Sequence, residues 1–236
     1  DGSETVSALE ARVTSLSERA AALALDLSRR RRATAQALER RLEAELQDLA
    51  MGGTRFAVDF RLKPSPGSGV WMEGEEVAVD AAGCDVVEFL LSANRGEALR
   101  PLAAVASGGE LSRLMLGLEV VLRGPSPRRT LVFDEVDAGV GGAVADVLGR
   151  KLRNLSAAHQ VLCVTHLAPI ASQADRHARV SKRARGERTE VLVEPLDAPA
   201  RVREIARMLA GETLTPSALK HAEEMLARGT VRPRAR

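Results

Sequence analysis

Two adjacent carboxylates follow an apolar run in the middle of the chain. The run Thr130–Phe133 (TLVF) leads directly into Asp134 and Glu135. Successive side chains on a strand point to opposite faces, so the two acids cannot share one role. An acid at the end of a strand can hold Mg²⁺, usually through water, while the next acid can orient or deprotonate an attacking water. The pair therefore suits hydrolysis assisted by a metal ion, although an apolar strand followed by two acids also occurs often by chance.

A glycine-containing loop stands upstream of these acids. It reads Ser107-Gly108-Gly109-Glu110-Leu111-Ser112 and precedes a predicted amphipathic helix. Glycines let the backbone approach a ligand closely, and the free N–H groups at a helix amino terminus attract an anion. The loop therefore predicts binding of a terminal phosphate. Ser107 also suits the role of helix N-cap, which is compatible with that function.

Thr165-His166 is predicted to end the next apolar strand, Gln160–Thr165. In a doubly wound fold, ligands bind at the carboxyl ends of the strands. An imidazole at that position can hydrogen-bond a γ-phosphate or an attacking water. A capping or surface histidine is the alternative, and we interpret the other three histidines as structural, namely His159, His177 and His221.

A second glycine-rich stretch, Asp137-Ala138-Gly139-Val140-Gly141-Gly142, follows the acid pair. Its glycines allow turns with positive φ, and Asp137 could bond across an interface. A plain loop-to-helix turn capped by Asp137 is the alternative. The stretch is not a phosphate-cradling Walker A loop, because the pattern G-x-x-x-x-G-K-[ST] is absent from the 236 residues.

The elements expected around these residues fall into three parts. Residues 4–50 contain no Gly or Pro, and the apolar positions Leu9, Val13, Leu16, Ala20, Leu23 and Leu27 follow the a/d spacing of a heptad seam. One amphipathic helix on a globular core is the alternative for these residues. The run Arg29–Arg32 could touch DNA, but a solvated helix face is favoured. We predict a coiled-coil helix at 1–50, a globular domain at 51–228 and a disordered basic tail at 229–236.

The globular part is expected to be α/β. The sequence predicts strands at 55–62, 76–79, 85–91, 130–134 and 160–165, helices at 109–122, 142–155, 201–210 and 216–227, and a hairpin formed by 178–183 and 190–195. Buried parallel strands separated by helices indicate a doubly wound, mostly parallel sheet with β hairpins.

Composition excludes several classes of protein. No run of eighteen apolar residues could cross a membrane, and Cys84 and Cys163 are too few for a disulfide framework or a metal site. Both cysteines are interpreted as buried small hydrophobes, which suits a reducing cytoplasm. A net charge of +2 limits any nucleic-acid binding to local patches. Because the chain starts Asp1-Gly2-Ser3 without an initiator Met, we expect it to be a fragment.

Taken in order, four motifs resemble those of ATP-binding-cassette ATPases. Ser107–Glu110 resembles the signature loop, Leu131–Glu135 the Walker B motif, Asp137 the D-loop and His166 the switch histidine. The combination is similar to the SMC branch, in which a long coiled coil separates two halves of a split head. Longer stretches resemble the RecN family of bacterial DNA repair proteins, namely residues 105–113, 133–140, 163–171 and 204–211. The similarity runs from about Arg55 to Leu226.

The resemblance implies a division of work between these residues. Asp134 would serve Mg²⁺, Glu135 would be the general base, and His166 would sense the γ-phosphate. The loop Ser107, Gly108, Gly109 and Glu110 would contact ATP held by the other head of a homodimer, and Asp137 would communicate across that interface.

The same resemblance implies partners and a cellular setting. Walker A and the Q-loop would lie in an amino-terminal half, without which this chain is expected to be inactive. The resemblance further implies DNA as a partner, recombinational repair of double-strand breaks as the process, and a cytoplasmic, nucleoid-associated location.

Two kinds of alternative remain open at this point. The first keeps the ATPase and changes its task, as in a transporter cassette or another SMC-like head, although heptads before residue 50 disfavour the transporter. The second is a structural coiled-coil module whose head dimerises without turnover.

Overall fold

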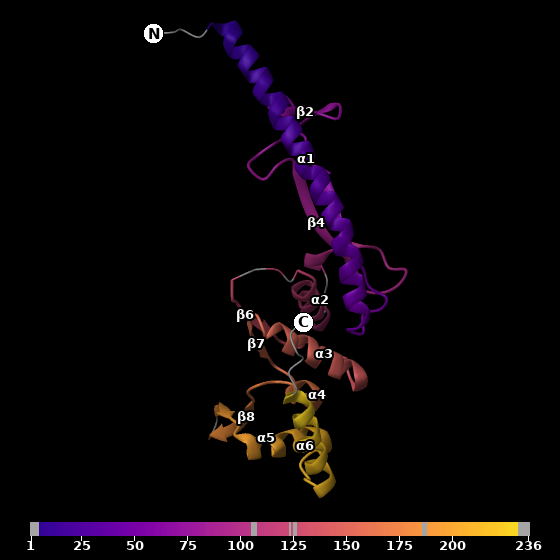
Figure 1. Cartoon of the computed structure of the whole chain (residues 1–236), viewed down its shortest axis with the longest axis vertical. Coiled ribbons are helices and arrows are strands. Elements are labelled where there is room, and N and C mark those ends of the chain that lie inside the picture. The colour runs from indigo at the N-terminus through magenta and orange to yellow at the C-terminus, as the bar shows by residue number, and fades with distance from the viewer. Residues whose placement is uncertain (1–4, 105–107, 123, 125–126, 186–187, 231–236) are drawn as a thin grey trace. The chain divides into compact units, whose positions relative to one another are not determined.

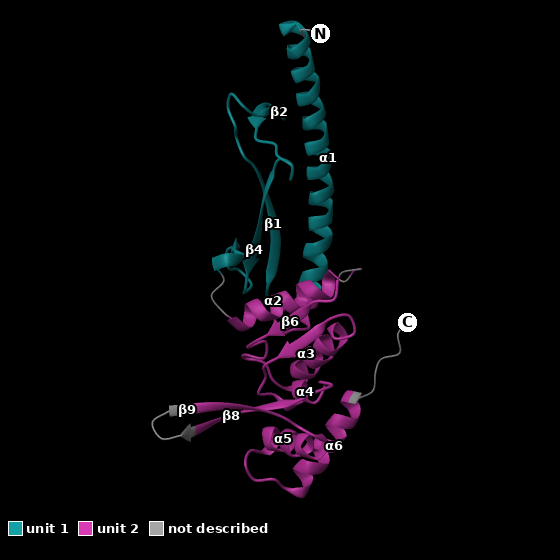
Figure 2. Ribbon diagram, turned by 90° about the vertical axis from the view of Figure 1, so that its left-hand side faces the viewer, with its two compact units in different colours: residues 1–44, 53–105 teal, residues 45–52, 106–236 magenta. Residues whose placement is uncertain are grey.

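The computed structural model describes residues 5–104, 108–122, 124, 127–185 and 188–230 (Figure 1). The chain divides into two compact units, one made of residues 1–44 with 53–105 and the other of 45–52 with 106–236 (Figure 2). The first unit joins most of the long helix to the strands that follow it. These compact units do not coincide with the predicted domains, whose boundaries lie after residues 50 and 228. The predicted domain boundaries therefore remain a prediction. Of the predicted tail, residues 231–236 lie outside the described part.

Helix α1, Val6–Gln47, runs uninterrupted for 42 residues. Its apolar seam is exposed, with 44% of Leu9, 62% of Val13, 56% of Leu16 and 64% of Leu23 accessible. An exposed apolar seam at heptad spacing is typical of a helix that packs against a second helix in a coiled coil. The later leucines of the same segment, Leu42, Leu46 and Leu49, are fully buried, so the two phases predicted from the sequence have different surroundings.

The strands of the first unit form two antiparallel sheets. Their bounds are β1 Arg55–Leu62, β2 Val70–Met72, β3 Glu75–Val77, β4 Asp85–Ser92 and β5 Arg100–Pro101, followed by a 3₁₀ turn, Leu102–Ala104. Strand order is β1-β4-β5 in one sheet, and β2 pairs with β3 in the other. The sequence predicted β1, β3 and β4, whereas the short strands β2 and β5 were missed.

Part of the arginine run in α1 turns toward the sheet. Arg31 lies 3.1 Å from the carboxylate of Asp85, whose side chain is fully buried. The guanidinium of Arg32 stacks 4.8 Å from the ring centroid of Phe60. The first two arginines of the run pair with an exposed acid of α1 itself. The expectation of a solvated face therefore fails for Arg31, which pairs with a buried acid, whereas Arg32 is exposed although it contacts Phe60.

The second unit alternates helices and strands. Its elements are α2 Gly108–Val121, β6 Thr130–Phe133, α3 Gly142–Leu155, β7 Gln160–Cys163, α4 Ala168–Ala171, β8 Ala178–Arg185, β9 Arg188–Pro195, α5 Ala198–Ala210 and α6 Pro216–Thr230. β6 and β7 are parallel, and β8 and β9 form an antiparallel hairpin. The predicted α/β alternation is confirmed. Among the described strands, β6 and β7 are the only parallel pair.

Small residues pack the helices that follow β7. The cluster contains Ala168 and Ala171 of α4, Ile205 and Ala206 of α5, and Ala222 of α6, all of which are buried. Because four of the five are alanines, the helix backbones can approach closely. This cluster packs α4 against α5 and α6. Because α4 begins two residues after His166, the packing restricts the turn that carries Thr165 and His166.

No helix in the described ranges is both long enough and apolar enough to cross a membrane.

Candidate functional site

The parallel pairing of β6 and β7 brings the two predicted chemical motifs to one edge. Phe133 pairs with Cys163, and the N–H of Val164 donates to the carbonyl oxygen of Phe133 at 2.9 Å. Both strands therefore end at the same level. Asp134–Glu135 follows one strand and Thr165-His166 follows the other, as ligand-binding residues do at the carboxyl ends of parallel strands.

Glu135 has an unusual backbone. Its φ is 55°, a left-handed conformation that non-glycine residues adopt at a cost of about 1–2 kcal/mol. The hydroxyl of Ser112 in α2 donates to the carbonyl oxygen of Asp134 at 2.7 Å and ties the preceding residue to the helix. The carboxylate side chains of Asp134 and Glu135 belong to exposed residues. Strain concentrated at an exposed acid is a common feature of functional sites.

The two glycines at the start of α2 lie against this strained turn. A Cβ on Gly108 would lie 2.7 Å from Oε2 of Glu135, and a Cβ on Gly109 would lie 2.8 Å from Cβ of Ala138. Real Cβ atoms do not come so close to other heavy atoms. The glycine loop and the acid pair, which are separate in the sequence, therefore form one contiguous structure.

Arg113 holds the segment that follows Glu135, and sequence reasoning missed it. Its guanidinium Nη1 donates to the carbonyl oxygen of Ala138 at 2.8 Å and to that of Val136 at 3.4 Å. The residue is only 7% exposed, and this burial lowers the pKa of the Arg113 guanidinium. The sequence offered only a weak signal for this role of Arg113: it lies four residues after Gly109 and therefore on the same face of α2.

Asp137 connects the segment after Glu135 with the turn after β7. Its Oδ2 accepts hydrogen bonds from the hydroxyl of Thr165 at 2.5 Å and from the backbone N–H of His166 at 3.1 Å. Nδ1 of His166 lies 3.1 Å from the same oxygen. The side chain of Asp137 is 4% exposed, while that of His166 is 75% exposed. The carboxylate thus points inward and the imidazole outward.

Most of the predicted site residues come together in this way. The structure gathers Gly108, Gly109, Asp134, Glu135, Asp137 and His166 around the end of the β6–β7 pair. Glu110 is half-buried on the first turn of α2, where its charge raises the pKa of Arg113 against the effect of burial. Ser107 lies outside the described residues.

The two cysteines differ in their surroundings. Cys84 is buried in the core of the first unit, as predicted. Cys163 is half-buried at the end of β7, and burial, reinforced by the charges of Asp137 and Asp134, raises the pKa of its thiol to about 12. A thiol with such a pKa stays protonated at neutral pH and is a poor nucleophile.

The exposed acids at this edge can be compared with what different metal ions require. No group of three or more His, Cys, Asp or Glu side chains within the described ranges is arranged to hold a metal ion. Mg²⁺ differs from structural metals because it keeps several waters and uses one or two carboxylates together with phosphate oxygens. The exposed carboxylate of Asp134 fits that requirement.

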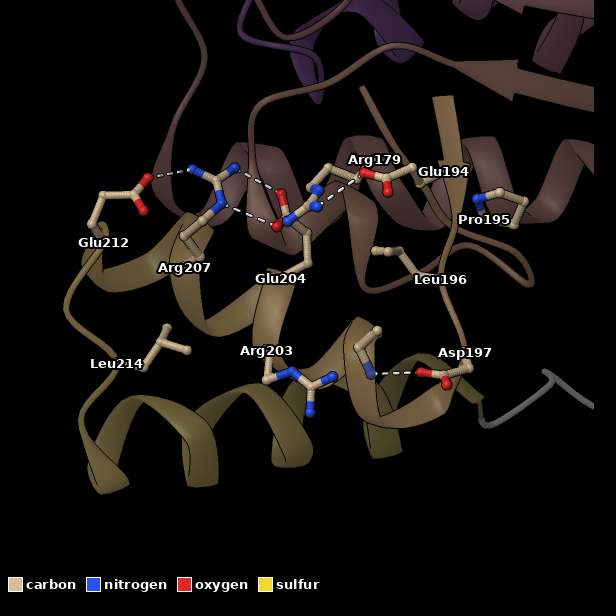
Figure 3. A pocket seen from close by; sticks show the side chains of 11 residues that line it. Arg179, Glu194, Pro195, Leu196, Asp197, Arg203, Glu204, Arg207, Glu212 and Leu214 are labelled. Atoms are coloured by element: carbon tan, nitrogen blue, oxygen red, sulfur yellow. Dashed lines mark hydrogen bonds and ion pairs between the residues drawn. The ribbon is translucent and has the colours of Figure 1, made fainter. Parts of the chain in front are cut away.

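A cavity of about 500 Å³ lies elsewhere in the second unit, between the β8–β9 hairpin and α5 (Figure 3). Four of its charged side chains are paired, because Arg207 donates to both carboxylate oxygens of Glu204, at 2.7 and 3.0 Å, and Arg179 donates to Glu194 at 3.0 Å. The hydrogen bond from Arg207 holds the pKa of Glu204 below its usual value. None of the residues lining the cavity belongs to the predicted site.

Comparison with known proteins reveals close relatives. The chain is 44% identical over 203 residues to the DNA repair protein RecN of Treponema pallidum and 45% identical over 204 residues to that of Streptomyces coelicolor. Each alignment covers 86% of this chain. Identity to RecN of Bacillus subtilis is 36%, over 92% of the chain. The chain belongs to the RecN family.

The alignments also define how much of a RecN protein is present. The chain spans 34%, 36% and 38% of the length of these three RecN relatives, about a third in each case. No family model matches the sequence. Among solved structures, the Smc head domain with a coiled coil and joint from Pyrococcus yayanosii aligns with 80% of this chain at 18% identity and a TM-score of 0.44. The SMC head domain from Thermotoga maritima aligns with 69% at 19% identity and a TM-score of 0.32.

Proposed function

We propose that this chain is the carboxy-terminal lobe of an SMC-like ATPase head that hydrolyses ATP during DNA repair. The observation that carries the proposal is the parallel register of β6 and β7, which brings Asp134, Glu135 and His166 to one edge. Three polar side chains of these types at the carboxyl ends of two parallel strands suit phosphoryl transfer to water.

The chemistry divides between the residues of this edge. Glu135 orients and deprotonates the attacking water, and its carboxylate is exposed to receive it. His166 presents its imidazole to the γ-phosphate, since its side chain is 75% exposed. Asp134 would hold Mg²⁺, and the ion, when bound, would supply positive charge that neutralises the phosphate oxygens.

The amino end of α2 serves a second nucleotide. Gly108 is exposed, and α2 is 14 residues long, so its unpaired N–H groups and dipole favour a phosphate. We assign Ser107, Gly108, Gly109 and Glu110 to ATP held by the other head of a homodimer. Two ATP molecules would then be enclosed between two heads, with binding closing the dimer and hydrolysis opening it.

One face of the β6–β7 pair is uncovered. Val132, Leu162 and Val164 are 66%, 49% and 61% exposed, and Val132 pairs directly with Leu162. Parallel strands are normally buried on both faces. We assign this apolar face to the amino-terminal half of the same head, which would carry Walker A and complete the nucleotide site. On this assignment the chain is inactive without that half.

The relatives are named as DNA repair proteins, and the proposal extends that role to this chain. The full protein would organise or tether DNA at double-strand breaks, and it would act in the bacterial cytoplasm at the nucleoid. The rival interpretation is a structural module whose heads dimerise without turnover. The two differ in one measurable property, which is hydrolysis that depends on Glu135.

The test is steady-state ATP hydrolysis by the complete protein with Glu135→Gln. Glutamine keeps the shape of the side chain but cannot accept the proton, so kcat should fall by about 10²–10⁴-fold, the usual contribution of a general base. ATP binding should persist, because the base does not hold the nucleotide.

Glu224→Gln, an exposed acid of α6, is the matched control and should hydrolyse ATP at the parental rate. Equal turnover in the parent and in Glu135→Gln would remove the general base from the proposal. A parental protein that binds DNA but shows no turnover at all would favour the structural module.

A further inference from the structure

The buried carboxylate of Asp137 has three polar contacts on a single oxygen. Oδ2 accepts hydrogen bonds from the Thr165 hydroxyl at 2.5 Å and the His166 backbone N–H at 3.1 Å, and His166 Nδ1 lies 3.1 Å from it. The hydroxyl of Thr165 in turn accepts the N–H of Leu167 at 3.0 Å. The carboxylate therefore fixes both the backbone turn and the ring of the histidine.

This geometry favours a proton on one particular nitrogen of His166. A carboxylate oxygen has no proton to offer, so at 3.1 Å it attracts a protonated Nδ1 and repels the lone pair of a bare one. When the ring is neutral, Nε2 is then the bare nitrogen. In either protonation state Nδ1 is occupied, and Nε2 is the atom left for a ligand. Because the imidazole is 75% exposed while the carboxylate is 4% exposed, Nε2 lies on the solvent side.

We propose that Asp137 is a positioning residue, which selects the Nδ1-protonated tautomer of His166 and directs Nε2 toward the nucleotide. The inference rests on the proposed function for its ligand, a terminal phosphate or the water that attacks it. It gives Asp137 a task within its own head, because Oδ2 of its carboxylate is occupied by contacts with Thr165 and His166.

The arrangement parallels the way a buried aspartate orients a catalytic histidine in hydrolases. In that setting the carboxylate acts through the imidazole and never touches the substrate. His166 is accordingly the residue that contacts ligand, and Asp137 acts through it. Thr165 supports the same oxygen and prevents the carboxylate from rotating away.

The direct test is the tautomer of His166, read from ¹⁵N chemical shifts of the 236-residue chain with labelled histidine. The chain has four histidines, so His166→Gln identifies the signal by its loss. In the parent we expect a protonated Nδ1 and a bare Nε2 at a pH where the ring is neutral. In Asp137→Ala the signal should change to the Nε2-protonated form that a free histidine side chain prefers.

A second variant guards against misfolding of the alanine variant. Asp137→Asn keeps the size of the side chain, but its amide can present either oxygen or NH₂ to the ring. The Nδ1-protonated population should therefore be lower than in the parent. Signals of His159, His177 and His221 serve as internal controls and should stay unchanged in both variants. An unchanged tautomer of His166 in both variants would overturn the proposal.

Turnover of the complete protein separates this inference from the proposed function. Asp137→Asn should lower kcat by about tenfold or more while KM for ATP stays within about threefold, because orientation of a catalytic group is lost rather than binding. If the tautomer changes as expected but the parental complete protein shows no ATP hydrolysis, the ATPase proposal fails and the positioning of His166 stands. If kcat falls while the tautomer of His166 is unchanged, the positioning role is wrong.

Discussion

At the scale of single residues, Glu135 and the glycines at the start of α2 share one packed turn. The left-handed turn at Glu135 packs closely on α2, where Gly109 leaves room for the carbonyl oxygen of Glu135 and Gly108 leaves room for its carboxylate. Arg113 then holds the following carbonyl groups from the same helix. A side chain at either glycine would therefore disturb the turn that carries Glu135.

Gly109→Ala tests this dependence. Its Cβ would lie 2.8 Å from Cβ of Ala138 and 3.0 Å from the carbonyl oxygen of Glu135, so the turn must shift. Such overpacking typically costs about 1–3 kcal/mol. We expect the free energy of unfolding, measured by urea denaturation, to fall by that amount.

Gly52→Ala is the matched control, because a Cβ there meets nothing within 4 Å. Both positions belong to the second unit. The close packing of α2 on the acid-bearing turn would be refuted by equal stabilities of the two variants.

The residues of the site were largely predictable, and the reasons for the exceptions are physical. Asp134, Glu135 and His166 could be found because each directly follows an apolar run, and parallel pairing then had to bring them together. Arg113 could not be found, since a charged side chain on an amphipathic helix normally faces water. The inward direction of Asp137 depends on donors from another strand end, which no local pattern reveals.

At the scale of elements, α1 is bound to its sheet by polar contacts as well as by apolar packing. Asp85 of β4 is fully buried and receives Ser28 at 2.6 Å and Arg31 at 3.1 Å. Glu39 and Glu43, one turn apart on α1, accept the backbone N–H groups of Val58 and Phe56 at 2.8 and 3.0 Å. The helix therefore satisfies donors along one edge of β1, which protects that edge from pairing with another strand.

Asp85→Asn tests the contribution of the buried acid. The charge that pairs with Arg31 is removed while the side chain keeps its size, and hydrogen bonds to charged groups contribute about 1.5–3 kcal/mol. Amide hydrogen exchange should accelerate by about tenfold or more in peptides covering residues 20–35 and 85–92.

Asp26→Asn is the control. Asp26 forms ion pairs with exposed arginines of the same helix, and exposed ion pairs contribute about 0–1 kcal/mol to stability. This variant should therefore change the rate of amide hydrogen exchange little. If the two variants exchange alike, Asp85 does not anchor the helix.

The prediction of elements succeeded where local patterns are strong. Absence of Gly and Pro predicted α1, and alternation of Phe56, Val58 and Phe60 predicted β1 with its observed bounds. The two-residue strand β5 and the four-residue helix α4 carry too few residues for a period to show. Their positions are set by pairing with β4 and by the alanine-rich helix cluster.

At the scale of the whole molecule, the chain presents surfaces that its own residues leave uncovered. The β6–β7 pair has an exposed face of three aliphatic side chains, and the seam of α1 exposes four more apolar positions. The chain also spans only about a third of its RecN relatives, 34–38% of their length. These observations support a nucleotide site that is shared between this chain and a half that carries Walker A.

Reconstitution tests that central claim most directly. The chain is mixed with the separately produced amino-terminal half of the same protein, and phosphate release from ATP is measured with Mg²⁺ present. The account predicts negligible release by either half alone, release by the mixture, and loss of that release when the chain carries Glu135→Gln. The account would be contradicted if the chain alone hydrolysed ATP as fast as the mixture. It would also be contradicted if the two halves formed a stable complex that did not hydrolyse ATP.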